Sequence, residues 1–351
     1  ISLSCSMLLA QDSPQQPFRL NKWLDTPSNF RISGSERIRY EGLDGQFRDN
    51  NTRDVEDQVF SRLLLRADDT HEQWGATVEG MDARAWGTKA DSFANTTTVN
   101  TLDVLQANLS WTSDDGHSGT VGRYTMAIGS RRLSARNRYR NTINSFNGVR
   151  WDYQGEDGYE TGAFWSTPTI RQPGNRTELV DNEHDWDTQS LDFQFFGVHA
   201  TQHIDARSDV QVYLLGLSDH RVGKTSRDLT TAGFRYLVTA APGRMFGETE
   251  IAYQFGGRGT EDVTAYFAHG AVGKQFDYAM KPKLGFALDV ASGNDSDNPD
   301  WNRFDTLFGA RRWEYGPTGI YGAIGRRNIV SPEIRLTVKP VDNLTVMFAA
   351  R

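Results

Sequence analysis

The sequence has almost no cysteine, no long hydrophobic run and no excess of basic residues. Its one cysteine, Cys5, excludes an intramolecular disulfide and a metal site built from cysteines. No stretch of about 18 consecutive apolar residues exists, which excludes a helical membrane span. The net charge of −7 excludes a generally basic nucleic-acid-binding protein, because binding to phosphates needs a broad cationic surface.

Motifs of catalysis and of metal binding are missing as well. The seven histidines are scattered, and no HExxH, GxSxG or P-loop pattern occurs. The acidic segments 181–187 and 295–300 offer oxygen atoms of the kind that Ca²⁺ prefers, but neither has the full EF-hand spacing. We interpret them as solvated loop charge, and we expect a protein that is not an enzyme and that has no cofactor and no metal.

The first residues suggest export from the cytoplasm. Residues 1–11 contain a short apolar run that ends in the small residue Ala10, typical of the end of a signal peptide. A polar lead-in follows over residues 12–28, and we expect a single folded domain over residues 29–351.

Most of that domain alternates between apolar and polar residues with a period of two, which predicts strands with one apolar and one polar face. About 15 such segments occur, most of them 8–11 residues long, the length that a tilted strand needs to cross a membrane. We expect strands at 30–40, 59–67, 74–86, 102–111, 119–127, 146–154, 159–167, 191–201, 209–217, 230–238, 246–255, 263–275, 283–291, 331–338 and 344–351. In lipid each unpaired backbone group costs several kcal/mol, so such strands must pair around a cylinder. The fold class predicted is all-β, an antiparallel transmembrane β-barrel of the bacterial outer membrane.

The connections between these segments support a barrel. Long links such as 42–57, 128–145 and 292–330 alternate with short ones such as 68–73 and 340–343, and 256–262 is the exception in length. Outer-membrane barrels sort their connections in this way, because short turns face the periplasm and longer loops face outside. Aromatic residues near strand ends, among them Tyr124, are expected to face outward as interfacial girdles.

An unusual run of arginines lies in the middle of the chain. Between Asp115 and Asp152 there is no acidic residue, yet seven arginines occur. These are Arg123, Arg131, Arg132, Arg136, Arg138, Arg140 and Arg150. We expect Arg123 and Arg150 to face the lumen, because a charge on the lipid face costs about 2–4 kcal/mol at the membrane midplane. Rings of arginine suit an anion-selective pore, since guanidinium groups donate paired hydrogen bonds to carboxylates.

Other strands carry further arginines at inward positions, and we expect Arg39, Arg62 and Arg66 to lie across the lumen from this run. Carboxylates that could neutralise such arginines are present as well. We take Glu41, Glu79, Asp82 and Asp152 as the counter-charges. For any single arginine, a structural ion pair and a contact with substrate both remain open.

The arginine run also resembles a known family. The segment from Gly122 to Asn141, with 145–150, is similar to the signature of alginate-export outer-membrane porins, and 30–41, 282–295 and 304–308 support the resemblance. It implies a monomeric barrel of about 18 antiparallel strands with an electropositive constriction that passes a polyuronate such as alginate. Only about 15 strands fit into the sequence, and no terminal aromatic residue appears, so we expect a C-terminal piece to be missing.

Our leading hypothesis is a substrate-selective outer-membrane channel for an anionic polysaccharide or oligosaccharide. The alternatives are a general or small-anion uptake porin, and an adhesin or receptor that acts through loops 168–190 and 292–330. The residues expected to contact substrate are Arg39, Arg62, Arg66, Arg123, Arg132, Arg136, Arg138, Arg140 and Arg150. Expected partners are outer-membrane lipid and the polymer, with periplasmic export partners left open, and no nucleic acid.

Overall fold

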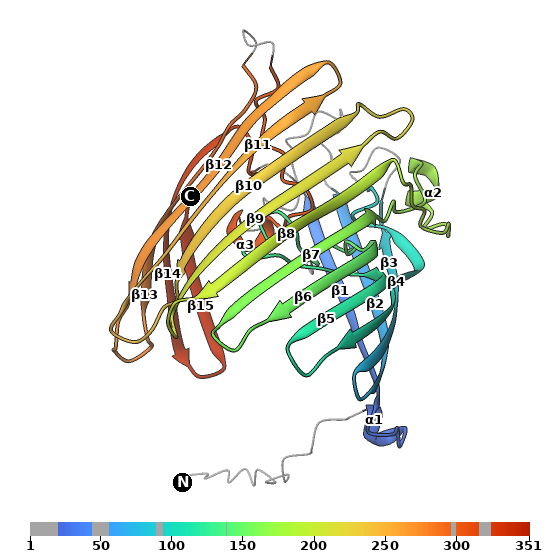
Figure 1. The fold of residues 1–351 in the computed structure, drawn as a ribbon, viewed down its shortest axis with the longest axis horizontal. Coiled ribbons are helices and arrows are strands. Elements are labelled where there is room, and N and C mark those ends of the chain that lie inside the picture. Colours follow the sequence, from blue (N-terminus) through green and yellow to red (C-terminus); the bar gives the residue numbers. More distant parts are fainter. Residues whose placement is uncertain (1–19, 44–55, 89–93, 138, 296–299, 316–323) are drawn as a thin grey trace, which may run out of the picture.

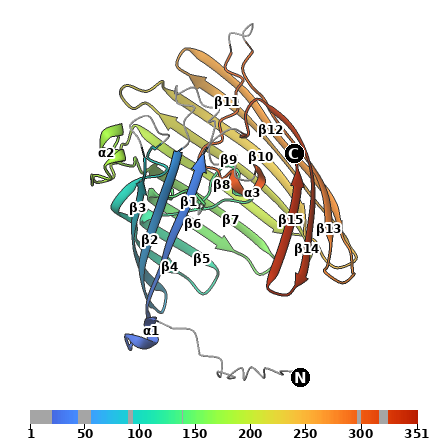
Figure 2. The ribbon, with the colours of Figure 1, turned by 180° about the vertical axis from the view of Figure 1, so that it is seen from behind.

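A computed structural model describes residues 20–43, 56–88, 94–137, 139–295, 300–315 and 324–351. The predicted signal-peptide remainder, most of the lead-in and Arg138 lie outside this part. Among the described residues, fifteen strands form a single sheet in which each strand pairs with the next along the chain. The sheet curls around a central space, and Figure 2 shows its edge strands β1 and β15 on the same side of the molecule.

The strands are long enough to cross a membrane, and the helices are single turns. The strands are β1 (Phe30–Leu43), β2 (Glu56–His71), β3 (Trp74–Trp86), β4 (Asn100–Thr112), β5 (His117–Tyr124), β6 (Phe146–Gln154), β7 (Tyr159–Pro168), β8 (Phe193–His203), β9 (Ser208–Asp219), β10 (Arg227–Val238), β11 (Met245–Arg258), β12 (Glu261–Gln275), β13 (Lys283–Ala291), β14 (Ile329–Val341) and β15 (Leu344–Ala350). The helices are α1 (Leu20–Trp23), α2 (Arg176–Val180) and α3 (Arg312–Tyr315). In the described residues no helix has the length and apolar character needed to span a bilayer.

Each of the fifteen expected segments overlaps one strand, and every pair of neighbours is antiparallel. The all-β prediction is therefore confirmed. Short turns such as 72–73 and 342–343 lie at one end of the strands, and the long connections lie at the other. Residues 259–260, within the segment expected to be the exception, form a two-residue turn at the long-loop end.

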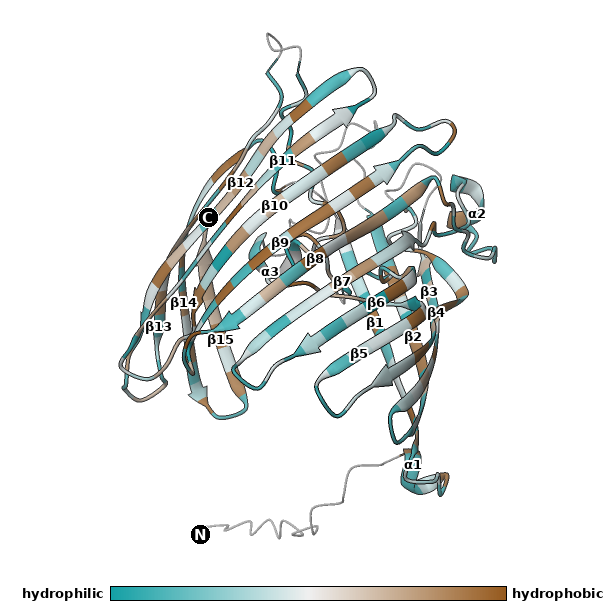
Figure 3. Cartoon of the chain, viewed as in Figure 1, coloured by the Kyte–Doolittle hydropathy of each residue, from teal (hydrophilic) through white to brown (hydrophobic). Residues whose placement is uncertain are grey.

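The two faces of the sheet differ, as alternation requires. Hydrophobic and hydrophilic residues follow each other along most strands in Figure 3. Leu109, Val121 and Val149 are paired across three strands and are exposed, which places them on the outer face. Tyr124 is an exception to the predicted outward aromatic residues. It is only 3% exposed and packs in a buried cluster with Phe146 and Phe164, so this expectation is wrong.

Two of the long loops fold back inside the sheet rather than away from it. Leu133 in loop 125–145 and Phe304 in loop 292–328 pack together with Phe267 and other buried residues of the wall. The two loops also pair, since the amide of Phe308 donates to the carbonyl oxygen of Leu133 at 2.9 Å. Figures 1 and 2 both show α3, which belongs to the second loop, within the curve of the sheet. The loops therefore form a layer across the central space, which we call the loop layer.

Candidate functional site

Inward-facing arginines of the wall hold the first loop of this layer. Arg39 on β1 donates to the backbone carbonyl oxygen of Tyr139 at 2.8 Å and also pairs with Glu41. Arg62 on β2 donates to the carbonyl oxygen of Arg140 at 3.0 Å. Both arginines point into the lumen, as the alternation predicts, but in this structure their guanidinium groups fix the loop backbone.

Arg136 forms an ion pair with Glu79, one of the residues proposed from the sequence as a counter-charge. Arg136 Nη2 lies 2.6 Å from Glu79 Oε1, and Gln106 donates to the other oxygen of Glu79 at 2.5 Å. The arginine run contains no acid, yet Arg136 finds one on β3, 57 residues away in the sequence. Arg136 is therefore fixed by a counter-charge from the wall.

Arg66 and Arg150 are each paired with an acid two residues farther along the same strand. Arg66 Nη2 lies 2.6 Å from Asp68, and Arg150 Nε lies 2.6 Å from Asp152. Residues two apart share a face of a strand, so these pairs are set by local sequence alone. They are half-buried and partly neutralised.

Two of the predicted lumen residues lie instead on the outer face. Arg123 follows Val121 by two residues in a ladder without a register shift, and Val121 is 53% exposed on the outer face. Arg123 pairs with Asp103 at 3.2 Å and donates to Asn147 at 2.8 Å. The lumen assignment of Arg123 is therefore corrected. It relied on Tyr124 facing lipid, and the ring of Tyr124 packs into the core.

Asp82 is the second residue on the outer face. It is paired across β2 and β3 with Leu63, which is exposed. Its carboxylate accepts hydrogen bonds from Arg84, two residues farther along the strand. Asp82 is therefore no counter-charge for the lumen arginines.

Arg132 lies at the centre of the loop layer and is fully buried. Its guanidinium contacts three carboxylates, those of Glu248 and Glu250 on β11 and that of Glu314 on α3. Arg326 is also fully buried and pairs with the other oxygen of Glu314. This network joins both loops of the layer to the wall.

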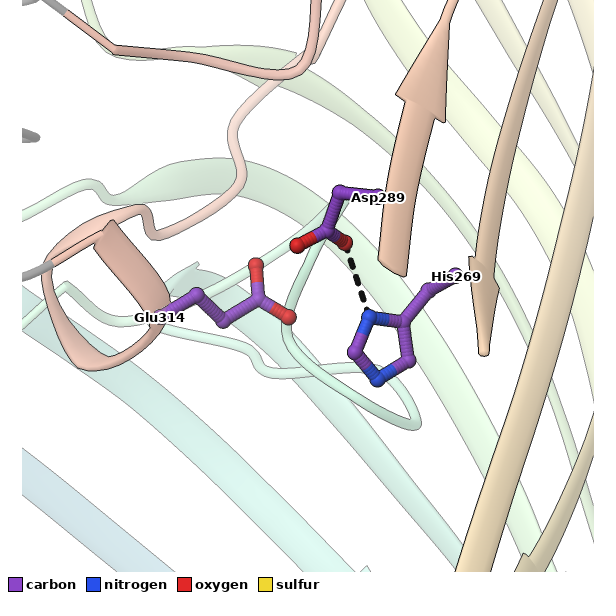
Figure 4. Close-up of side chains that lie close together, drawn as sticks. All are labelled: His269, Asp289 and Glu314. Atoms are coloured by element: carbon purple, nitrogen blue, oxygen red, sulfur yellow. Dashed lines mark hydrogen bonds and ion pairs between the residues drawn. The ribbon is translucent and has the colours of Figure 1, made fainter. Parts of the chain in front are cut away.

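Three members of the same region could in principle hold a metal ion. His269, Asp289 and Glu314 offer ligand atoms within 4.8 Å of one another, and Figure 4 shows them facing a common point. His269 Nδ1 lies 2.7 Å from Asp289 Oδ1, while the other oxygen of Asp289 lies 2.6 Å from Arg351. Since arginines already pair with the carboxylates of Asp289 and Glu314, the three residues fit an ion-pair network better than a cation site.

Arg140 differs from the other arginines of the run. Within the described part of the chain, its guanidinium makes no hydrogen bond and no ion pair, and its charged neighbours are Arg311 and Arg171. Burial and these two cations lower the pKa of Arg140 to about 9. The guanidinium of Arg171 donates to the carbonyl oxygen of Thr96 at 2.6 Å and to Asn144 at 3.2 Å. These three arginines form an electropositive site, which we call the arginine triplet.

Two cavities adjoin the loop layer and differ in charge. The cavity at the long-loop end has a volume of about 550 Å³ and is lined by eight arginine or lysine side chains, including Arg311 and Arg326, against two aspartates. The cavity at the short-turn end, about 450 Å³, is lined by four cationic side chains, among them Arg132, and by three glutamates. Positive charge is therefore concentrated at the long-loop end.

Sequence reasoning missed Arg171, Arg311 and Arg326. Arg171 lies in the loop between β7 and β8, and Arg311 and Arg326 lie in the loop between β13 and β14. The local signals available were adjacent pairs of arginines, such as Arg326 with Arg327, and their position in loops at one end of the barrel.

Several solved structures have a fold similar to that of this chain. Pseudomonas aeruginosa OpdQ is similar with a TM-score of 0.60 and 12% identity, covering 91% of this chain and 80% of that one. A BenF-like porin from Pseudomonas fluorescens Pf-5 has a TM-score of 0.63 and 11% identity, covering 92% and 82%. P. aeruginosa OccK2 (OpdF) in complex with glucuronate has a TM-score of 0.56 and 10% identity, covering 91% and 78%. A search of curated proteins found no match.

The fold of the chain is therefore that of a porin. Residues 29–351 match the Alginate export family, and the chain belongs to that family. The family and the fold together indicate a channel in the bacterial outer membrane rather than an enzyme.

Proposed function

We propose that the protein is a substrate-selective channel for an anionic polysaccharide or oligosaccharide, an alginate-like polyuronate. The observation that carries this proposal is the arginine triplet. Arg140 has no acidic partner in the described chain, although it lies in a loop folded into the lumen. A carboxylate of a passing uronate would supply the missing negative charge and accept paired hydrogen bonds.

Four other arginines of the predicted site have one of two roles. Arg39 and Arg62 position the loop that carries Arg140, because they hold its backbone carbonyl groups. Arg66 and Arg150 keep their own aspartates and contribute a weaker positive field along the wall. Weak and repeated contacts suit transport, since a substrate must leave each site as readily as it enters.

Planar bilayers test the proposal with the full-length protein. In a potassium chloride gradient the channel should prefer chloride, and guluronate or mannuronate oligomers should reduce the current. Arg140→Gln should lower the chloride preference several-fold and weaken the block. The matched control is Arg244→Gln, which removes an exposed arginine from the short turn between β10 and β11. Equal effects of both variants, or an unblocked wild-type channel, would reject the proposal.

A small-anion channel is the second candidate, and one observation favours it. OccK2, which shares this fold, was solved with glucuronate, a single uronate. The two functions differ in how block depends on chain length. A polymer channel should be blocked at lower concentrations by longer oligomers, whereas a small-anion channel should respond equally to glucuronate and to a hexamer.

A further inference from the structure

The carboxylate of Glu314 lies between two buried arginines. One of its oxygens is 2.5 Å from Arg132 Nε, and the other pairs with Arg326 Nη2. Both arginine side chains are 0% exposed and that of Glu314 is 3% exposed. Two guanidinium groups around one carboxylate are a strong arrangement for a carboxylate ligand, because each hydrogen bond is assisted by charge.

The ion pair between Glu314 and Arg326 joins residues that line two different cavities. Arg326 lines the cationic cavity at the long-loop end, and Arg132 and Glu314 line the cavity at the short-turn end. An anion that moves between the two cavities along this route meets both arginines at the place that Glu314 occupies.

Glu314 is also the member of the network that is held least by the wall. Glu248 and Glu250 belong to the long strand β11, and both remain on Arg132 if Glu314 moves away. Glu314 belongs to α3, a single helical turn within a loop. Arg326 Nε is buried and has no hydrogen-bond acceptor in the described chain, so its guanidinium can bind more oxygen atoms than Glu314 supplies.

We propose that Arg132 and Arg326 form a carboxylate-binding site that Glu314 occupies in this structure, and that a uronate carboxylate of the substrate replaces Glu314 there. This inference rests on the proposed function for the identity of the substrate. The exchange conserves charge, because one carboxylate leaves the two arginines as another arrives. Glu314 thereby acts as an internal competitor, and the channel is closed along this route until substrate binds.

The test compares two variants of the full-length protein in planar bilayers, with a guluronate hexamer as the probe. Glu314→Gln removes the competing charge and should lower the hexamer concentration needed for half-block by roughly tenfold, as expected if the site is open about one-tenth of the time in the wild type. Arg326→Gln removes half of the site and should raise that concentration. The proposal predicts that the two variants shift the half-blocking concentration in opposite directions. A purely structural ion pair would be lost in both variants, and both would then shift this concentration in the same direction.

Matched controls remove the same charges from the same cavities. Glu333→Gln deletes a buried glutamate of the short-turn cavity that pairs with Arg335 and Arg351 instead. Arg258→Gln deletes a cation of the long-loop cavity that pairs with Glu261. Glu314→Gln should lower the half-blocking hexamer concentration much more than Glu333→Gln does. Equal effects of Glu314→Gln and Glu333→Gln, or a common direction for Glu314→Gln and Arg326→Gln, would overturn the site.

A folding check and a second variant separate a failure of assembly from a failure of the proposed site. Folded barrels migrate differently before and after boiling on a denaturing gel, which checks assembly of each variant. If Glu314→Gln does not assemble, Glu314→Asp replaces it with the same expected direction, because its shorter side chain draws the carboxylate away from both arginines. A wild-type channel that the hexamer fails to block would refute the proposed function itself, whereas normal wild-type block with indistinguishable variants would refute only this site.

Discussion

The guanidinium of Arg62 on β2 donates a 3.0 Å hydrogen bond to the backbone carbonyl oxygen of Arg140. One arginine of the wall thus positions another whose side chain has no acidic partner in the described chain. The positive charge available to a substrate depends on this backbone contact as well as on Arg140 itself.

Replacing Arg62 should therefore loosen the loop rather than simply remove a charge. Arg37 also donates to the carbonyl oxygen of Arg140, at 2.9 Å, so Arg62→Gln removes one of its two charged donors. A hydrogen bond from a charged group contributes about 1.5–3 kcal/mol to the free energy of unfolding. We expect a larger and noisier single-channel current, measured in planar bilayers, together with lower thermal stability. The control Arg66→Gln breaks a half-buried pair with Asp68 and should cost at most about 1 kcal/mol. Equal effects would contradict the positioning role of Arg62.

Gly309 is required where the two loops of the layer meet. A Cβ atom at this position would lie 1.7 Å from the carbonyl oxygen of Arg132, so Gly309→Ala must push the loops apart. Overpacking of this kind costs about 1–3 kcal/mol. Hydrogen exchange of residues 131–135 should accelerate in this variant. Gly257→Ala is the control, because a Cβ atom there meets nothing within 4 Å, and its exchange should match the wild type.

Arg123 should matter for stability and not for ion selectivity. It lies on the outer face and pairs with Asp103, whose side chain is almost fully buried. Removing the arginine leaves a buried carboxylate unpaired, at a cost of about 3–5 kcal/mol. Arg123→Ala should unfold at lower denaturant concentration while its chloride preference stays unchanged. A reversal of selectivity would restore the original lumen assignment.

The loop 169–192 should respond to pH through Asp187. Its carboxylate accepts hydrogen bonds from Asn100 at 2.9 and 3.0 Å, and the backbone amide of Asp187 donates to Asp103. Burial, and then the charge of Asp103, raise the pKa of Asp187 to about 6. A raised pKa means that the docked loop favours the protonated acid. Docking is therefore strongest below about pH 4 and weakens as the pH rises through about 6.

Hydrogen exchange of residues 182–188 measures this effect. After correction for the intrinsic rate, protection in the wild type should fall between pH 5 and pH 7.5. Asp187→Asn, which resembles the protonated acid, should keep its protection at both values. PH-independent protection in the wild type would show that Asp187 does not control docking.

The strands could be predicted from the sequence because their signal is local. Alternation over eight to eleven residues, with long and short connections in turn, follows directly from one lipid face and one lumen face. The pairs Arg66–Asp68 and Arg150–Asp152 are equally local, since two residues on one strand share a face. The tests of Arg62 and Gly309 concern the loop layer, where no such local signal exists.

The partners of the loop arginines could not be predicted, because they come from distant parts of the chain. Arg136 pairs with a glutamate 57 residues away, and Arg132 pairs with acids 116, 118 and 182 residues away. In the sequence, a run of arginines without nearby acids therefore looks free of partners. In the folded protein, most of these arginines have partners. Arg140 retains that character in the structure, and only the folded loops bring Arg171 and Arg311 beside it.

The central claim is that the lumen is cationic and receives carboxylates. The most direct measurement is the reversal potential of the full-length wild-type channel in a tenfold potassium chloride gradient, before and after addition of guluronate oligomers. The account predicts a potential of the sign that chloride preference produces, and a current that falls as the oligomer concentration rises. A potential of the opposite sign, or a current that oligomers leave unchanged, would contradict it.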